Sequence, residues 1–254
     1  MTLDPARLED LIAECLRTFY RHRLDKIKEM RLTSILGRKN PYLFRALATE
    51  SASEIVQQIM RAFLSASDET IFGNDFFEPI AREASGGHAS DAKGVDVIVE
   101  TPNRISAYAV KSGTVAQNAS ASAKQQQEFD ELRSRLFKLQ KQFDPVLGAA
   151  YGRKNVDATN RRTFRTISGQ KFWAELTGDS EFYVRLITLM RDIPEQHKRA
   201  YQPEWDAAVN RLTHEFFDQF CHQDTGHIDW EKLVRFVSSE EKPKAARRSK
   251  KNPD

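Results

Sequence analysis

The feature that most constrains this chain lies between residues 95 and 111, where the spacing of apolar residues changes from helical to a period of two. Val95, Val97 and Val99 alternate with other residues, and after the turn TPNR a second alternating run ends at Lys111. A period of two is typical of β-strands, because successive side chains point to opposite faces of a sheet. Two such runs with a short turn between them predict an antiparallel hairpin.

The segments on both sides of the hairpin have mostly helical spacing. Residues 4–31 carry one apolar stripe, and Ser51 with Glu54 forms a capping-box pattern before another helix. Gly73 and Pro79 leave the bounds of a helix at 70–84 open. Helices and strands in this order predict an α/β fold in which helices flank a mixed β-sheet. The remaining expectations are a loop at 86–94, strands at 145–152 and 163–169, and helices at 121–143, 170–176, 181–190, 196–221 and 229–237.

Composition and charge exclude several classes of protein. The two cysteines, Cys15 and Cys221, are too far apart in sequence to indicate a disulfide framework. No apolar run approaches the roughly 20 residues of a membrane span, and acids near the N-terminus do not fit a signal peptide. We therefore expect a cytoplasmic protein with no membrane partner.

The distribution of charge is more informative than the net charge of +3. Basic residues gather at 17–45, at 153–165 and in the tail after Glu240. Such clusters favour a polyanionic partner. The alternative for any single cluster is a solvated helix face or a disordered tail.

The hairpin carries one acid and one base at its two ends. Pairing across the turn brings Asp96, at the start of the first strand, near Lys111, at the end of the second. A carboxylate there can bind Mg²⁺, and a lysine can orient water or neutralise charge on a phosphate. The alternatives are a simple salt bridge, or an edge strand protected by charge.

Several strings in the chain resemble those of a known enzyme family. A glutamate on a helix, an aspartate on a strand and a hairpin ending in hydrophobic-x-Lys resemble the PD-(D/E)XK nuclease superfamily. More specifically, the strings resemble the PmeII family of type II restriction endonucleases. They run in order from about Lys39 to Phe236: NPYLFRA, ETIFGNDFFEPIA, GVDVIVE, VKSG, PVLGAAYGR, SGQKFWAELTGD and FCHQDTGHIDWEKLV.

This resemblance implies a Mg²⁺-dependent endonuclease that cuts double-stranded DNA at a specific short sequence. It also implies a homodimer and a cognate DNA methyltransferase in the same system. The expected organisation is a restriction-endonuclease-like core at 69–178. An N-terminal helical region at 1–68, for dimerisation and DNA clamping, precedes it. A C-terminal helical region at 179–240 and a basic disordered tail at 241–254 follow it.

The resemblance also assigns roles to residues. It makes Asp96 the metal-ligating aspartate, Lys111 the catalytic lysine and Glu78 a further metal or water ligand. The superfamily pattern has Asp or Glu two residues before the lysine, where this chain has Ala109. This departure matters because a single carboxylate holds Mg²⁺ poorly.

Three explanations for Ala109 stay open. In the first explanation, Glu128 supplies the missing carboxylate from the following helix, 17 residues after Lys111. Alternatively, Glu78, Asp96, the backbone carbonyl of Val110 and a substrate phosphate suffice for metal binding. In the third explanation the site is inactive, and the protein binds DNA without cutting it.

DNA contacts are expected from two polar segments, because specific cleavage needs phosphate contacts for position and base contacts for choice. One segment follows Lys111 and continues into the next helix, and the other joins the two later strands. The candidate DNA-binding residues are Ser112, Gln117, Asn118, Ser120, Lys124, Arg153, Asn155, Asn160, Arg161 and Arg162.

A nuclease of the same fold in repair or modification-dependent defence remains an alternative to a restriction endonuclease.

Overall fold

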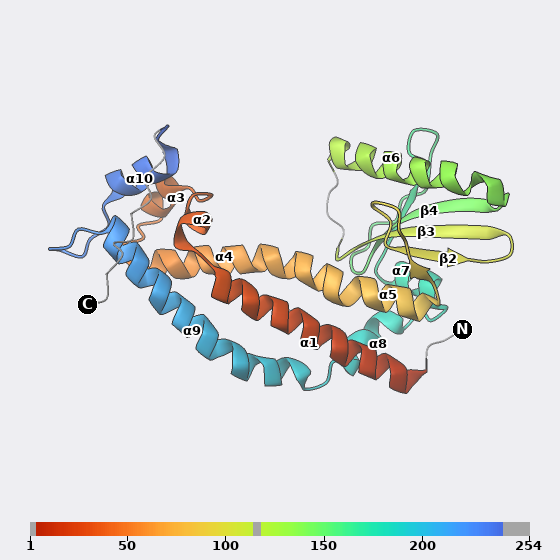
Figure 1. Ribbon diagram of the computed structural model, residues 1–254, viewed down its shortest axis with the longest axis horizontal. Coiled ribbons are helices and arrows are strands. Elements are labelled where there is room, and N and C mark those ends of the chain that lie inside the picture. Colours follow the sequence, from red (N-terminus) through yellow and green to blue (C-terminus); the bar gives the residue numbers. More distant parts are fainter. Residues whose placement is uncertain (1–3, 114–117, 241–254) are drawn as a thin grey trace, which may run out of the picture. The chain divides into compact units, whose positions relative to one another are not determined.

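The computed structural model describes residues 4–113 and 118–240 (Figure 1). The chain divides into two compact units, and each unit is made from two separate segments. The first unit comprises Met1–Leu24 and Ala66–Ala200, and the second comprises Asp25–Ser65 and Tyr201–Asp254. Within the described ranges, no helix combines the length and the apolar character needed to cross a membrane.

A five-stranded mixed sheet forms the centre of the first unit, and its strands lie in chain order from β1 to β5. β2 pairs antiparallel with β3, which confirms the predicted hairpin. The pairs β3–β4 and β4–β5 are parallel, so the sheet is mixed, as predicted. The strands are β1(His88–Ala89), β2(Val97–Glu100), β3(Arg104–Lys111), β4(Gln142–Ala149) and β5(Arg165–Ser168).

One face of the sheet is covered by the helix α6(Ala119–Leu136) (Figure 1). Phe129 and Leu132 of this helix pack with Ala107 and Ala109 of β3 in one buried cluster. Residues three apart on a helix point to one side, and so do residues two apart on a strand. The two pairs of side chains can therefore face each other. This packing holds α6 against the strand that ends at Lys111.

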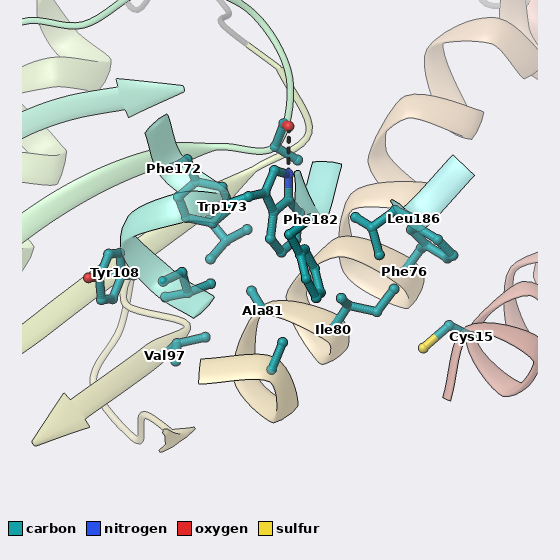
Figure 2. Close-up of a cluster of buried hydrophobic side chains, with 14 of the residues drawn as sticks. Cys15, Phe76, Ile80, Ala81, Val97, Tyr108, Phe172, Trp173, Phe182 and Leu186 are labelled. Carbon is teal, nitrogen blue, oxygen red and sulfur yellow. Dashed lines mark hydrogen bonds between the residues drawn. The ribbon is translucent and has the colours of Figure 1, made fainter. Parts of the chain in front are cut away.

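The opposite face packs against α5(Glu78–Ser85), α7(Gln170–Thr177), α8(Phe182–Leu189) and the first half of α1(Pro5–Glu29). Figure 2 shows Val97 and Tyr108 of the sheet facing the helical side chains of this cluster. Trp173 is almost fully buried there, and its indole N–H donates to the carbonyl of Ala150 at 2.9 Å. Buried aromatic side chains of this kind contribute much of the packing in a core.

The segment at 70–84, whose helix bounds the sequence left open, is not one continuous α-helix. The helix expected at 70–84 is the end of α4(Ala52–Phe72), followed by the π-helical segment η1(Gly73–Phe77) and α5. Pro79 is tolerated because it lies in the first turn of α5, where a missing N–H costs little. The segment expected as a loop at 86–94 also contains the two-residue strand β1, which is too short to show a period.

The helix expected at 121–143 is longer than the helix that forms there. α6 ends at Leu136, a 3₁₀ turn η2(Phe137–Leu139) follows, and Phe143 lies in β4. Leu136 and Phe143 both pack against the cluster under α6, from a helix and from a strand. Their spacing therefore fits a helical period by coincidence, while backbone pairing with β3 selects the strand.

The second unit is helical and has its own buried core. The predicted cap at Ser51 is confirmed, since its hydroxyl accepts a hydrogen bond from the N–H of Glu54 at 3.2 Å, while the Glu54 carboxylate accepts from Gln58. Asn40 caps a short helix that the sequence did not predict, by accepting from Tyr42 and Leu43. The helices that lie in this unit or enter it are α1, α2(Leu32–Leu36), α3(Pro41–Ala46), α4, α9(Ile193–Phe220) and α10(Trp230–Ser238).

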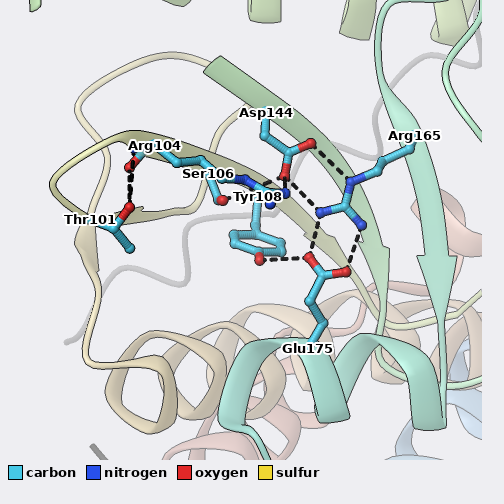
Figure 3. A network of polar contacts seen from close by, with 7 residues as sticks. All are labelled: Thr101, Arg104, Ser106, Tyr108, Asp144, Arg165 and Glu175. Atoms are coloured by element: carbon cyan, nitrogen blue, oxygen red, sulfur yellow. Dashed lines mark hydrogen bonds and ion pairs between the residues drawn. The ribbon is translucent and has the colours of Figure 1, made fainter. Parts of the chain in front are cut away.

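A network of charged side chains joins β3, β4, β5 and α7 (Figure 3). The guanidinium of Arg165 donates to Asp144 at 2.7 and 2.9 Å and also contacts Glu175. Glu175 in turn accepts a hydrogen bond from the hydroxyl of Tyr108 at 3.1 Å. The two arginines Arg104 and Arg165 hold the pKa of Asp144 below its usual range, although burial opposes them.

We expect Arg165→Met to lower the free energy of unfolding by about 3 kcal/mol, because it leaves Asp144 and Glu175 without their shared cation. Arg165 and Asp144 are only 18% and 14% exposed, so solvent screens them little. In urea denaturation, the matched control Arg235→Met should change stability by less than about 1 kcal/mol, since its partner Glu231 is exposed. Equal effects of the two substitutions would contradict a structural role for the network.

Candidate active site

Asp96 lies directly before β2, and its backbone and side chain are both held by β3. Its N–H donates to the carbonyl of Tyr108 at 2.8 Å. Its carboxylate oxygen Oδ2 accepts a hydrogen bond from the N–H of Val110 at 2.7 Å. The chain reaches this position through Gly94, whose φ of +72° is a conformation that glycine adopts readily. The carboxylate is thus fixed at the open end of the hairpin.

Lys111 ends β3 at the same corner of the sheet. Its ammonium Nζ lies 3.9 Å from Oδ2 of Asp96, which is an ion pair rather than a hydrogen bond. The lysine side chain is 47% exposed and that of Asp96 is 24% exposed. The antiparallel hairpin therefore brings together the acid and the base that the sequence places at its two ends, and the lysine faces solvent.

Glu78, the first residue of α5, belongs to the same electrostatic neighbourhood. Burial raises the pKa of its carboxyl to about 7, and the negative charge of Asp96 adds to this effect. The positive charge of Lys111 lowers the pKa, and so partly opposes the increase. α5, which begins at Glu78, packs against the hairpin in the buried cluster that contains Val97 and Val110. The three residues named from the family pattern therefore occupy one region of the first unit.

The π-helical segment η1 brings the helix before Glu78 against the end of β3. The Ser112 hydroxyl donates to the carbonyl of Glu69 at 2.8 Å. A side-chain carbon on Gly73 would lie only 2.8 Å from that hydroxyl oxygen, so the close approach requires glycine. π-Helical turns often occur at functional sites. Here the turn sets the position from which α5 begins.

The donor groups at this corner suit a hard divalent cation. Asp96 and Glu78 offer two carboxylates, and Mg²⁺ is often bound by one or two carboxylates together with substrate phosphates and water. A cation between them would also offset the repulsion that raises the pKa of Glu78. Among residues 4–113 and 118–240, no group of three or more His, Cys, Asp or Glu side chains is placed to hold a metal ion. A metal held by Asp96 and Glu78 would therefore need phosphate and water to complete its shell.

Ala109 has a packing role. Its side chain is fully buried in the cluster between the sheet and α6, with Phe129 and Leu147. A carboxylate at this position would enter an apolar environment, where an unpaired charge is strongly disfavoured. Ala109, two residues before the lysine, is therefore a core residue and faces away from solvent.

Glu128 lies on α6 with its side chain only 12% exposed. Its carboxylate packs against Gly94, where a β-carbon would come within 1.9 Å of Oε2. Lys124 is 4.0 Å from it. Glu128 is thus next to the segment that leads into Asp96, but it does not complete a group of three acids with Glu78 and Asp96. Its part in metal binding remains a prediction.

Among the candidate DNA-binding residues after Lys111, Ser112 is held by its hydrogen bond to Glu69, and the others fall into three groups. Asn118 is the N-cap of α6 and accepts a hydrogen bond from the N–H of Ala121 at 2.8 Å. Ser120 and Lys124 lie exposed on the first turns of this helix. Gln117 lies outside the described residues. The exposed pair is therefore free of the structural role that Asn118 performs.

The candidates between β4 and β5 divide in the same way. Asn155 accepts a hydrogen bond from the N–H of Ser168 at 3.2 Å, which ties the segment to β5. Arg162 donates to two carbonyls of its own segment, at 3.0 and 3.2 Å. Exposed side chains remain at Arg153, Asn160 and Arg161.

Sequence reasoning missed Tyr151, which follows β4. Its N–H donates to the carbonyl of Ser112 at 3.1 Å, one residue beyond the lysine. Its ring lies against Gly113, where a β-carbon would come within 2.2 Å of it. The string AAYGR at the end of a buried strand was the available signal, since residues at the ends of parallel strands often line binding sites.

We expect Glu78→Gln to raise the melting temperature at pH 8 and to have little effect at pH 4. Because the folded-state pKa of about 7 exceeds the usual value of 4.5, the folded state favours the protonated acid. The contribution of Glu78 to the free energy of unfolding is therefore greatest at low pH and is lost as pH rises through about 7. Glutamine has no charge to bury, so it removes this loss. Differential scanning fluorimetry at both pH values measures the effect. An equal or lower melting temperature at pH 8 would contradict the raised pKa of the buried Glu78 carboxyl.

Comparison with known proteins identifies a family for this chain. The model of the type II restriction endonuclease EcoO109I family matches residues 6–198, which is more than half of the chain. No curated protein matches the sequence. The family consists of nucleases that act on DNA, and its members generally use divalent metals. The matched range includes Glu78, Asp96 and Lys111. This chain belongs to the type II restriction endonuclease EcoO109I family.

Proposed function

We propose that this protein is a Mg²⁺-dependent endonuclease of the PD-(D/E)XK type that hydrolyses double-stranded DNA at a specific short sequence. The observation that carries the proposal is the corner where Lys111 lies 3.9 Å from Asp96, and where burial, together with the charge of Asp96, raises the pKa of Glu78. A salt bridge alone would not explain why a second carboxylate is held there at the cost of repulsion. Perturbed carboxylates of this kind cluster at functional sites.

In the proposed reaction, water attacks the phosphorus and the bond to the leaving sugar oxygen breaks. Asp96 and Glu78 would hold Mg²⁺, which supplies Lewis acidity and lowers the pKa of bound water. The Val110 N–H holds the Asp96 carboxylate in position through its 2.7 Å hydrogen bond. The half-exposed ammonium of Lys111 can orient the attacking water and stabilise negative charge on the phosphate.

Sequence choice is assigned to the exposed members of the two polar segments. Arg153 and Arg161 present guanidinium groups, which read guanine in a two-pronged geometry, and Asn160 presents an amide, which can read adenine. The exposed Ser120 and Lys124 would contact phosphates. A homodimer would let two such sites cut the two strands, and a cognate methyltransferase would protect the host DNA.

The test is incubation of the purified protein with supercoiled plasmid, with Mg²⁺ or with a chelator. The proposal predicts discrete, reproducible fragments that require Mg²⁺. Smeared products or nicking that follows DNA structure would indicate a repair or modification-dependent nuclease instead.

A second candidate function is DNA binding without cleavage. The observation that favours it is the burial of Ala109, which leaves the site without the acid of the superfamily pattern. Tight, salt-sensitive binding in a gel-shift experiment, together with intact plasmid in Mg²⁺, would select this function over cleavage.

A further inference from the structure

A cavity of about 810 Å³ opens in the first unit. Its walls come from the segment after β4, the start of α7 and one side of α8. Most of the lining is apolar or aromatic, including Phe77, Tyr151 and Tyr183, with a few polar side chains among them. Cavities of this size and composition are typical of sites that enclose a small organic group.

Backbone hydrogen bonds join this cavity to the catalytic strand. Ala150, which lines the cavity, donates its N–H to the carbonyl of Lys111 at 2.9 Å. The next lining residue, Tyr151, donates to the carbonyl of Ser112 at 3.1 Å. The cavity wall therefore follows β4 at the same end of the sheet where Lys111 ends β3, and DNA with a phosphate at Lys111, as the proposed function requires, would bring neighbouring nucleotides to this end.

The chemistry of the lining suits a nucleobase attached to a phosphate. Tyr151 and Tyr183 are 52% and 39% exposed, so each offers part of an aromatic face for stacking. Arg153 and Lys171 are exposed cations of the lining and give it a positive charge, and Lys171 can contact the backbone of the DNA. Among the described residues, no carboxylate lines the cavity. The charge is thus complementary to a nucleotide.

Amide groups supply the means to recognise a base edge. Asn155 uses its carbonyl oxygen to accept from Ser168, and this bond fixes the orientation of the amide. Gln170 donates its amide N–H to the carbonyl of Ser180 at 3.2 Å. Both side chains belong to the lining, and fixed amides can pair with the edge of a base that has left its partner.

We propose that this cavity receives one nucleobase, rotated out of the bound duplex next to the cleaved phosphate. A base that remains stacked in a duplex cannot enter a cavity lined on several sides. Rotation costs the pairing and stacking of that base, and the aromatic walls and amides offset this cost. The inference rests on the proposed function, because it needs DNA at Lys111.

Mismatch scanning tests the inference through the sign of its effect. The probe is a duplex selected from random double-stranded oligonucleotides by tight binding in Ca²⁺, which replaces Mg²⁺ to limit cutting. Single mismatches are placed at each pair in turn, and affinity is measured by fluorescence anisotropy. A mismatch at the rotated base removes part of the unpairing cost, so binding should tighten about tenfold there. Mismatches at pairs read in the groove should weaken binding.

Variants of the cavity connect this effect to its walls. Tyr183→Ala should abolish the tightening, because it removes one aromatic face. Gln170→Trp narrows the cavity at an exposed position and should act in the same way without loss of buried packing. Val184→Ala is the matched control, since Val184 is the next residue of α8, is 45% exposed and does not line the cavity.

Three outcomes would overturn the inference. If the protein binds and cuts DNA but no mismatch tightens binding, the cavity holds no base and the proposed function stands. If Tyr183→Ala disrupts a homodimer and leaves the tightening unchanged, the cavity is a protein contact. If the protein neither binds nor cuts DNA, the proposed function fails, and the inference fails with it.

Discussion

Asp96→Asn should reduce the rate of DNA cleavage about a thousandfold and leave DNA binding largely intact. Asparagine keeps the size of the side chain and an oxygen that can accept from Val110. It removes the negative charge of Asp96, which with Glu78 would hold Mg²⁺ at this corner. A loss of about 4 kcal/mol of transition-state stabilisation corresponds to a thousandfold in rate.

The measurement is the rate of cutting with enzyme in excess over plasmid, compared with affinity for the same DNA in Ca²⁺. Asp91→Asn is the matched control. Asp91 lies in the same part of the chain and pairs with Arg135, but its side chain is 81% exposed. The control should cut like the wild type. Undiminished cutting by Asp96→Asn would show that the metal site lies elsewhere.

Lys111→Met should reduce cutting about a hundredfold or more, the usual contribution of a positioned acid–base group. Methionine retains much of the apolar stem, and because the lysine side chain is 47% exposed, the fold should be unaffected. The substitution removes the ammonium that lies 3.9 Å from Asp96. The attacking water is then no longer oriented, and the negative charge on the phosphate is no longer stabilised, by this group.

Metal affinity separates the role of Lys111 from that of the acids. Calorimetric titration with Mn²⁺ in the presence of DNA should show that Lys111→Met binds metal at least as well as wild type, because a nearby positive charge is gone. Asp96→Asn should bind it much more weakly. Lys93→Met is the control, because Lys93 is an exposed lysine close to Asp96 in the sequence. Wild-type cutting by Lys111→Met would contradict a catalytic role.

The part of the site that could be predicted from the sequence is the part that depends on local pattern. A period of two defines the hairpin, and antiparallel pairing of its strands places Asp96 near Lys111. This inference needed only the alternation of side chains and a short turn.

The rest depends on contacts between segments far apart in the chain, which periodicity does not show. Glu78 reaches the site through a π-helical turn whose Gly73 fits against Ser112. The end of α6 at Leu136 is set by the pairing of β4 with β3, because Phe143 would continue the helical period equally well. Local propensity gave way to tertiary pairing in both cases.

Ala109 shows the same division between pattern and packing. The sequence identifies it as a departure from the superfamily pattern, but only the structure shows that it fills a cluster with Phe129. The missing acid therefore has a packing reason. Whether Glu128 compensates depends on how α6 meets the segment around Gly94 when metal and DNA are present, and a Glu128→Gln variant in the cleavage assay addresses this question directly.

The central claim is that this chain cuts double-stranded DNA at a defined sequence with the corner formed by Asp96, Glu78 and Lys111. Sequencing of fragment ends tests it most directly, after a long, unmodified DNA of known sequence has been digested in Mg²⁺. The claim predicts that every end falls at one fixed offset from the same short sequence, and that Asp96→Asn yields no such ends. Ends scattered without a common sequence, or an intact substrate, would contradict it.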